Sequence, residues 1–281
     1  MKKETHEYKV YYYDEGLGCI QDPKTKKYGF VDRQGNEVIP CQYKGAHNFC
    51  SGLCPVQDPE TDLWGYINHQ GEYEIKPQYK EASNFTSDRF EDLAVVQNEE
   101  GLWGVIDVYN RTKVPFRYNY LEKPQHWIED MITAGLNGKD GLLTTNGLEI
   151  LPCCYEIWVP KHLRLGDPAD EYSEISYIDM STGEEVTERV YDLVLKGQEI
   201  TNDLRERGVL DIIEWLGPTT ALAETTTNKY TIIKVDEEGT LEIYGENLSN
   251  KREYESIDQA VRTHLLAEKD KLLSQDKTID R

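Results

Sequence analysis

The segment Trp64-Gly65-Tyr66-Ile67-Asn68 decides the fold prediction, because four variants of it recur along the chain at a nearly constant spacing. The variants are Tyr28-Gly29-Phe30-Val31-Asp32, Trp103-Gly104-Val105-Ile106-Asp107, Asp140-Gly141-Leu142-Leu143-Thr144 and Ile175-Ser176-Tyr177-Ile178-Asp179. Their second positions are residues 29, 65, 104, 141 and 176, at steps of 36, 39, 37 and 35 residues. Such a period indicates a tandem repeat, in which each unit buries its apolar face against its neighbours.

Two further landmarks keep the same period. One tyrosine follows the middle of each unit, and these tyrosines are Tyr43, Tyr79, Tyr118, Tyr155 and Tyr191. In addition, residues 13–22 match residues 49–58, which lie 36 positions later. The array therefore opens in the middle of a unit.

Each unit is predicted to be a three-stranded meander. Residues 64–68 are aromatic and β-branched, and Asn68-His69-Gln70-Gly71 is typical of a tight turn. Glu74-Ile75-Lys76-Pro77 opens a second extended piece, in which the proline predicts a strand end, an edge or a bulge. A third short strand is expected in the Gly-Leu-x-x-Val segment that leads into the next Trp-Gly pair.

The fold prediction is a mainly β protein with about five short meander repeats in residues 1–191. An open, curved array is favoured over a closed five-bladed propeller, because about 36 residues is short for a four-stranded blade of about 40 to 45 residues. The ring would close if residues 13–21 were hydrogen-bonded to the fifth copy near Ser176.

The residues quoted above resemble the WG-repeat family of bacterial proteins. Trp64-Gly65-Tyr66-Ile67, the turn residue Gly71 and the Ile75-x-Pro77-x-Tyr79 pattern carry the resemblance, together with Ala82 and Phe85 and the segment at residues 49–56. The resemblance implies a repeated β module without an assigned molecular activity and without a catalytic motif. The repeat-defining residues, to which we assign structural roles, are Tyr28, Gly29, Trp64, Gly65, Trp103, Gly104, Gly141, Tyr43, Tyr79, Tyr118, Tyr155 and Tyr191.

The aromatic residue before each glycine is expected to join one copy to the next, because large rings at the structural period must be buried between repeats. The alternative is an exposed ring that stacks on a sugar or a base.

Residues 192–281 depart from the repeat and predict a small α-β-β-α region. A first helix, capped by Asn202 or Asp203, is expected to carry Val209, Ile212, Ile213 and Leu216 on one face. A threonine-rich loop at 219–227, a hairpin of 230–235 with 241–244, and a helix from Ser256 follow. The simplest role for this region is a cap over the open end of the array.

The net charge is −21, from 52 acidic and 31 basic residues. This sign disfavours nucleic acid and anionic membranes and favours a basic protein partner, although surplus acid also serves solubility. No apolar run of about 18 residues and no secretory leader is recognised, so a cytoplasmic protein with reduced cysteines is expected.

No cofactor is predicted, and the metal signal is weak. His47, Cys50 and Cys54 form an H-x-x-C-x-x-x-C run without a paired C-x-x-C motif, which favours core or strand-end cysteines over zinc. The chain contains no G-x-S-x-G, no phosphate-binding glycine loop and no H-E-x-x-H.

Three hypotheses follow for function. The first is a non-catalytic intracellular protein that binds or scaffolds other proteins through the repeat array. The second is an acidic inhibitor or immunity-type protein that binds a basic partner. The third is an enzyme with a site at the junction of the array and the C-terminal region. The partner and the oligomeric state are not determined by the sequence.

Overall fold

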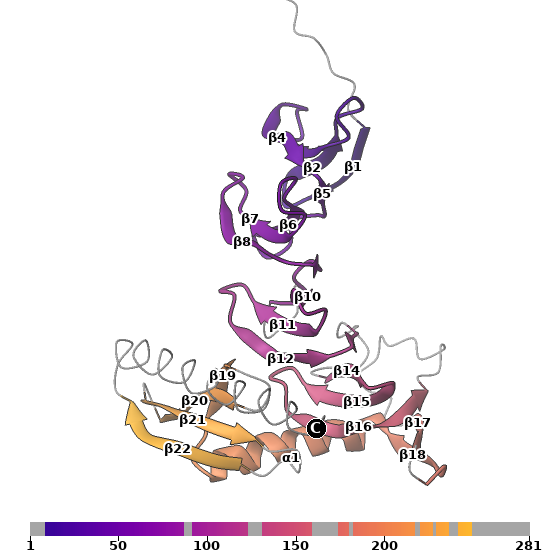
Figure 1. Ribbon diagram of the computed structural model, residues 1–281, viewed down its shortest axis with the longest axis vertical. Coiled ribbons are helices and arrows are strands. Elements are labelled where there is room, and N and C mark those ends of the chain that lie inside the picture. The colour runs from indigo at the N-terminus through magenta and orange to yellow at the C-terminus, as the bar shows by residue number, and fades with distance from the viewer. Residues whose placement is uncertain are drawn as a thin grey trace, which may run out of the picture. The chain divides into compact units, whose positions relative to one another are not determined.

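The computed structural model describes residues 9–86, 92–122, 131–158, 174–179, 182–216, 220–226, 229–235 and 241–248 (Figure 1). In these residues the secondary structure consists of 22 β-strands and one α-helix. The prediction of a mainly β protein is therefore confirmed. None of the described helical residues forms a segment long and apolar enough to cross a membrane.

The strands form five small sheets in which strands that follow one another in the chain lie side by side. The first sheet contains β1 (Lys9–Asp14), β2 (Leu17–Gln21), β3 (Tyr28–Val31) and β4 (Glu37–Tyr43). The second contains β5 (Gly45–Ala46), β6 (Cys54–Gln57), β7 (Trp64–Ile67) and β8 (Tyr73–Tyr79). The third contains β9 (Glu81–Ala82), β10 (Leu93–Gln97), β11 (Trp103–Asp107) and β12 (Thr112–Tyr118).

The fourth sheet has six strands, and the fifth sheet follows the helix. The fourth contains β13 (Tyr120–Leu121), β14 (Met131–Leu136), β15 (Lys139–Thr144), β16 (Glu149–Trp158), β17 (Glu174–Asp179) and β18 (Glu185–Arg189). The helix α1 (Val190–Glu206) follows, and then β19 (Asp211–Trp215), β20 (Thr220–Thr226), β21 (Lys229–Val235) and β22 (Leu241–Leu248) form the fifth sheet.

The chain forms two compact units. The first consists of Met1–Arg111, Phe116–Gln125 and Ile132–Asp140, and the second of Thr112–Pro115, His126–Met131 and Gly141–Arg281. The proposed boundary between residues 1–191 and 192–281 follows the repeat pattern instead and stays a prediction.

The repeat has one more strand than the sequence predicted. The extra strands β5 and β9 are only two residues long, and each pairs with the strand that follows the Gly-Leu segment or its counterpart. Two residues are too few to show an alternating pattern, so the prediction of a three-stranded unit was wrong for a physical reason. In the first sheet the equivalent strand, β1, has six residues.

Tight turns with a positive backbone angle connect the two long strands of each repeat. The residues at this angle are Gly35, Gly71, Asn110, Gly147 and Gly183, with φ values of 79°, 81°, 62°, 84° and 73°. Asn110 takes the place of a glycine here because asparagine tolerates this conformation better than other side chains do. The third copy therefore keeps the turn although its sequence lacks the glycine.

The first turn residue fixes the same loop with its side chain. In the first two copies, Oδ1 of Asp32 accepts hydrogen bonds from the amides of Gln34 and Asn36, and Oδ1 of Asn68 accepts them from Gln70 and Glu72. In the third copy, Oδ1 of Asp107 accepts from Tyr109 and Arg111. The polar residue that ends each Trp-Gly strand thus closes the hairpin.

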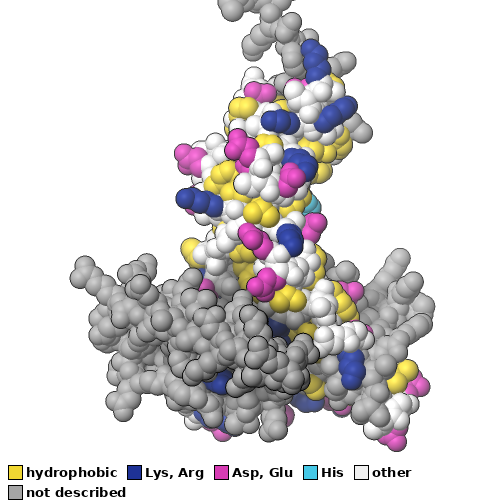
Figure 2. Space-filling view, viewed as in Figure 1, with side chains coloured by type: hydrophobic (Ala, Val, Ile, Leu, Met, Phe, Trp, Pro, Cys, Tyr) yellow, Lys and Arg dark blue, Asp and Glu magenta, His cyan; other side chains and the backbone are white. Residues whose placement is uncertain are grey.

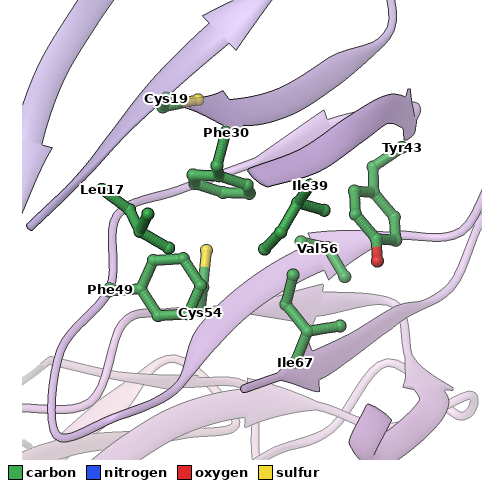
Figure 3. Packing of buried hydrophobic residues seen from close by; sticks show 9 residues of the cluster. All are labelled: Leu17, Cys19, Phe30, Ile39, Tyr43, Phe49, Cys54, Val56 and Ile67. Atoms are coloured by element: carbon green, nitrogen blue, oxygen red, sulfur yellow. The ribbon is translucent and has the colours of Figure 1, made fainter. Parts of the chain in front are cut away.

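The core of the first unit lies between consecutive sheets. One cluster joins Leu17, Cys19, Phe30, Ile39 and Tyr43 of the first sheet to Phe49, Cys54, Val56 and Ile67, which belong to the second copy (Figure 3). A second cluster joins Leu53, Tyr66, Ile75 and Tyr79 of that copy to Ala82, Phe85, Ala94, Val96 and Ile106 of the third. The second sheet therefore buries one face against the first sheet and the other against the third.

The described strands form an open array. Within the described residues, β1 pairs only with β2, and β2 pairs with β1 and β3. The fifth copy, β17 and β18, continues the fourth sheet by pairing with β16. The strands that would close a ring are not hydrogen-bonded to one another, so the prediction of an open array is confirmed.

In the second unit, α1 packs on the fourth sheet. Leu193 of the helix lies in one buried cluster with Leu142, Ile150, Leu151 and Tyr177. Gly197 allows close approach, because a Cβ there would lie 3.1 Å from Cδ1 of Ile150. A separate cluster joins the end of α1 to the fifth sheet through Leu204, Val209, Ile212, Trp215 and Ile233.

The predicted helix carrying Val209, Ile212 and Leu216 was wrong. The helix ends at Glu206, and Gly208 follows with φ of 85° while the amide of Val209 donates a hydrogen bond to the carbonyl oxygen of Leu204. This is a glycine-type helix end, so Ile212 and Trp215 continue as the strand β19.

The rest of the C-terminal region differs in part from the prediction. The threonine-rich stretch expected as a loop is the strand β20, in keeping with the preference of β-branched threonine for sheets. The predicted hairpin is present as β21 and β22. The helix predicted from Ser256 lies outside the described residues.

Candidate interaction surface

The glycine of each Trp-Gly pair leaves space for the backbone of the next strand. A Cβ on Gly29 would lie 2.6 Å from the carbonyl oxygen of Ile39, and a Cβ on Gly65 would lie 2.6 Å from that of Ile75. The register of the strand pair shifts at both places, and Pro40 or Pro77 lies within the shifted segment. The prolines therefore occupy a bulge in a sheet-edge strand, as the sequence indicated.

The fourth copy keeps this arrangement, whereas the third and fifth copies vary it. A Cβ on Gly141 would lie 2.7 Å from the carbonyl oxygen of Leu151, as in the first two copies. A Cβ on Gly104 would instead lie 2.8 Å from the ring of Phe116. Ser176 stands at the glycine position of the fifth copy, and its hydroxyl lies 3.0 Å from that of Thr187.

The aromatic residues before these glycines are half-buried. Tyr28 packs against the cluster between the first and second sheets, and Trp64 against the cluster between the second and third. The indole of Trp64 also covers Gly45 and meets the ring of His47 edge-on, with ring centroids 5.0 Å apart. Trp103 is half-buried at the corresponding place in β11.

Three of the five period tyrosines are buried at the ends of the edge strands. Tyr43, Tyr79 and Tyr118 have exposed fractions of 3%, 6% and 0%. Tyr155 lies in β16 and pairs in register with Asp179. Tyr191 lies in the first turn of α1, where half of its side chain is exposed, so the structure does not bring it to the same position as the others.

A recurring glutamine fixes the second type of turn, which joins β2 to β3, β6 to β7 and β10 to β11. The amide groups of Gln21, Gln57 and Gln97 donate hydrogen bonds to the carbonyl oxygens of Lys26, Asp62 and Gly101, at 2.8, 2.9 and 2.9 Å. Each acceptor residue has a positive φ. The recurrence of Gln followed by Asp or Asn was visible in the sequence, but its role in the turn was not predicted.

The tips of these turns differ from copy to copy although the framework is the same. The first tip carries Lys24 and Lys26, the second Glu60 and Asp62, and the third Glu99 and Glu100, and all six side chains are exposed. The strands that lead into the tips are alike, since the buried residues Leu17, Leu53 and Leu93 recur at or just before the start of each strand. We define the turn-tip surface as residues 23–26, 59–62 and 99–100.

The candidate metal ligands serve other contacts in the structure. The Sγ of Cys54 is buried and donates a hydrogen bond to the carbonyl oxygen of His47, at 3.3 Å. The imidazole of His47 faces Trp64. Among the described residues, no group of three His, Cys, Asp or Glu side chains is arranged to hold a metal ion.

The described cysteines are free thiols, and two of them are buried at one junction between sheets. Burial raises the pKa of the Cys19 thiol to about 11 and raises the pKa of Cys54 well above its usual value. Both thiols therefore stay protonated at neutral pH and act as small apolar groups.

Comparison with protein families agrees with the repeat geometry. The family described as "WG containing repeat" matches residues 28–58 and 64–102. These two segments are WG repeats, and the resemblance seen in the sequence is confirmed. No curated protein matches the chain.

Several solved structures show distant similarity to the chain. Hsv2 from Kluyveromyces lactis is 11% identical with a TM-score of 0.38, and the match covers 84% of each chain. The extracellular domain of a putative hybrid two-component system from B. thetaiotaomicron is 10% identical with a TM-score of 0.33, covering 84% of this chain and 33% of that one. The WD40 β-propeller domain of Doa1 is 11% identical with a TM-score of 0.26, covering 85% and 67%. TM-scores in this range do not define a shared architecture.

Proposed function

We propose that the protein is a non-catalytic, intracellular repeat protein that binds another protein through the turn-tip surface. One observation carries the proposal, namely that three turns, each fixed by a hydrogen bond from its glutamine amide to the carbonyl oxygen of the residue with positive φ, present different exposed side chains. A constant framework with variable tips is the arrangement by which rigid scaffolds carry recognition loops. The free thiols of the described cysteines fit a reducing compartment.

A binding role also agrees with the chemistry of the described residues. The cysteine thiols with shifted pKa values are held protonated by burial, which opposes a role as nucleophiles. We therefore assign the array to recognition and assign no reaction to it.

The proposal is tested by affinity purification of the tagged full chain from its native cell, followed by quantitative mass spectrometry. A tip variant combines Lys24→Ser, Glu60→Ser and Glu99→Ser, all at exposed positions. The matched control combines Lys196→Ser, Glu199→Ser and Glu206→Ser on the exposed side of α1 and removes the same charges.

We expect the wild type and the control to retain the same protein and the tip variant to retain at least about tenfold less, which corresponds to about 1.4 kcal/mol of binding free energy. Equal retention by all three chains would contradict the assignment of the surface. Retention of no protein above background would contradict the binding role itself.

A second candidate is an acidic inhibitor of a basic protein, and the second and third tips favour it. Glu60, Asp62, Glu99 and Glu100 place four exposed carboxylates on two adjacent turns. On the face shown in Figure 2, however, Lys and Arg side chains are interspersed with the acidic ones. The acidic side chains therefore do not form a uniform acidic surface on that face.

Salt dependence separates the two candidates. A complex steered by charge loses affinity steeply between about 0.05 and 0.5 M salt, because the Debye length falls to a few ångströms. Recognition through mixed apolar and polar contacts changes little over that range. An affinity that stays constant over that range would count against the inhibitor.

A further inference from the structure

The first sheet has a face that no other described sheet covers. Position 13 is equivalent to positions 49 and 85, since residues 13–22 match residues 49–58 and the repeat continues 36 residues later. Phe49 and Phe85 have 2% of their side chains exposed, because the preceding sheet packs on each of them. Tyr13 is 44% exposed.

The neighbouring residues identify this face as the counterpart of the buried one. Tyr13 and Val10 lie over Gly18, since a Cβ on that glycine would lie 2.7 Å from Cε1 of Tyr13 and 2.9 Å from Cγ1 of Val10. Gly18 is equivalent to Cys54, which packs toward the preceding sheet. Val10, at 37% exposure, is likewise equivalent to Ala46 of the packed cluster. We call Val10, Tyr13, Gly18, Ile20 and Val31 the open face.

The open face is constructed as a packing surface. Its inner strands carry the apolar residues Ile20 and Val31, which are already buried at 0% and 2% exposure, so Val10 and Tyr13 supply the exposed part of the face. Ile20 and Val31 alternate along β2 and β3 with the Cys19 and Phe30 side chains of the opposite cluster. The equivalent face of the next two sheets accepts a sheet and does not contact solvent. The chemistry that fits the open face is therefore an apolar β-sheet face.

A second copy of this chain offers such a face in its own first sheet. In each of the two chains, the face of the first sheet opposite the open face is covered by the second sheet, and the corresponding face of the second sheet is covered by the third. In each chain, α1 also packs on the fourth sheet. The open face of the second copy is left uncovered by these contacts. The pairing is then isologous, in which the same residues of both chains meet across a twofold axis.

The charge distribution favours this pairing. Residues 9–44 carry six basic and five acidic side chains, a net charge of +1, whereas the whole chain carries −21. Two copies that meet at this segment join their nearly neutral parts and avoid contact between their strongly acidic parts. Charge repulsion between the copies is therefore least in this arrangement.

We propose that two copies of the protein associate through their open faces, with Tyr13 and Val10 of each chain at the contact. The contact is independent of the turn-tip surface, so a partner protein and a second copy bind at different places. Tyrosine suits such a contact because it combines a large apolar ring with a hydroxyl that finds a hydrogen-bond partner when buried.

Sedimentation velocity of the full chain over about a hundredfold concentration range tests the proposal. We expect a monomer–dimer equilibrium in the wild type, and we expect Tyr13→Glu to weaken it at least tenfold, since it places two carboxylates in one apolar contact. Tyr109→Glu is the matched control, because Tyr109 is 77% exposed in the turn between β11 and β12. It should leave the dissociation constant unchanged.

Circular dichroism establishes that each variant is folded, and Val10→Glu replaces Tyr13→Glu if the latter unfolds. A monomer at every concentration overturns the proposal, whether the open face stays in solvent or is covered by residues 1–8. A dimer that Tyr13→Glu and Val10→Glu leave unchanged overturns it as well. If these measurements refute the dimer, the result of the affinity purification is unaffected, so each proposal can be refuted without the other.

Discussion

The hydroxyl of Tyr43 donates a hydrogen bond to the carbonyl oxygen of Gly71, at 3.3 Å, and so joins the first sheet to the turn of the next copy. Tyr79 makes the equivalent contact one repeat later, where its hydroxyl lies 2.6 Å from Oδ1 of Asn110. In both cases the acceptor belongs to the residue with positive φ in the following turn. The period tyrosine therefore links each copy to the copy after it.

Removing this hydroxyl should destabilise the array without a cavity. We expect Tyr43→Phe and Tyr79→Phe each to lower the free energy of unfolding by about 1 kcal/mol, the usual contribution of a partly buried hydrogen bond. Chemical denaturation monitored by fluorescence measures the change. Tyr109→Phe, at an exposed turn position, is the control and should change stability by less than about 0.5 kcal/mol. Equal effects at all three positions would contradict the linking role.

Gly65→Ala tests the close approach of backbones in the repeat. A methyl group there would lie 2.6 Å from the carbonyl oxygen of Ile75, so the strands must separate, and we expect a loss of about 3 kcal/mol. Gly35→Ala is the comparison, because Gly35 has a positive φ but no atom within 4 Å of an added Cβ. Its cost should be about 1 kcal/mol, from backbone strain alone. Urea unfolding of both variants gives the two values, and the reverse order would refute the explanation.

Stability should fall at acidic pH partly through Asp58. Hydrogen bonds from the amide of Thr61, opposed by some burial, and from the Thr61 hydroxyl and the amide of Glu60 lower the pKa of this carboxyl. A carboxyl with a lowered pKa in the folded state stabilises the fold above its unfolded pKa of about 3.9, and this contribution is lost as pH falls through the folded pKa.

The variant Asp58→Asn separates this contribution from the rest. At neutral pH it should be less stable than the wild type, and the difference should shrink as pH falls below about 4. Glu60→Gln, at the exposed tip of the same turn, should show no such convergence. Thermal unfolding of the three proteins between about pH 2 and 7 measures it, and parallel curves would exclude the assigned role of Asp58.

The buried thiols should be unreactive in the native protein. Cys19 and Cys54 have exposed fractions of 1% and 0%, and burial raises the pKa of both thiols. We expect iodoacetamide at about pH 8 to leave both unmodified until the protein is unfolded. Peptide mass spectrometry after timed labelling locates the modified residues. Rapid native labelling of Cys54 would contradict its place in the core.

The period of the sequence predicted most of the array. Recurrence of Gly29 and Gly65 with Tyr43 and Tyr79 was sufficient, because side chains that pack between copies must recur with the copies. Asn110 shows why the weaker third copy still folds in the same way, since asparagine accepts the φ that a turn glycine provides. The open array and the edge position of the prolines followed from the same pattern.

Features that depend on short or competing signals were not predicted. A two-residue strand such as β5 has too few side chains to give an alternating pattern. The apolar spacing of Val209, Ile212 and Leu216 suits a helix, but α1 ends before these residues because Gly208 adopts a positive φ immediately before Val209. In addition, a bulge between Ile212 and Glu214 interrupts the alternation that would have indicated a strand. Tyr191 matches the period of the tyrosines, yet it lies in α1 because the fifth copy ends at Arg189.

The turn-tip surface was only partly visible in the sequence. Gln21, Gln57 and Gln97 recur, but the sequence does not show that their amides reach the carbonyl oxygen of the residue with positive φ. The exposed tips between them look like ordinary polar loops. Their equivalence depends on the alignment of three turns in space, which only the structure supplies.

The central claim is that successive copies pack through equivalent ring pairs, and a double-mutant cycle tests it most directly. Phe30 and Phe49 meet with ring centroids 5.0 Å apart (Figure 3), and Tyr66 and Phe85 repeat the contact at 4.8 Å. Leucine substitutions made singly and together should give coupling free energies of about 0.5 to 1.5 kcal/mol for both pairs and almost none for Phe30 with Phe85, which belong to different clusters. Coupling absent from both adjacent pairs, or equally strong for Phe30 with Phe85, would contradict the account.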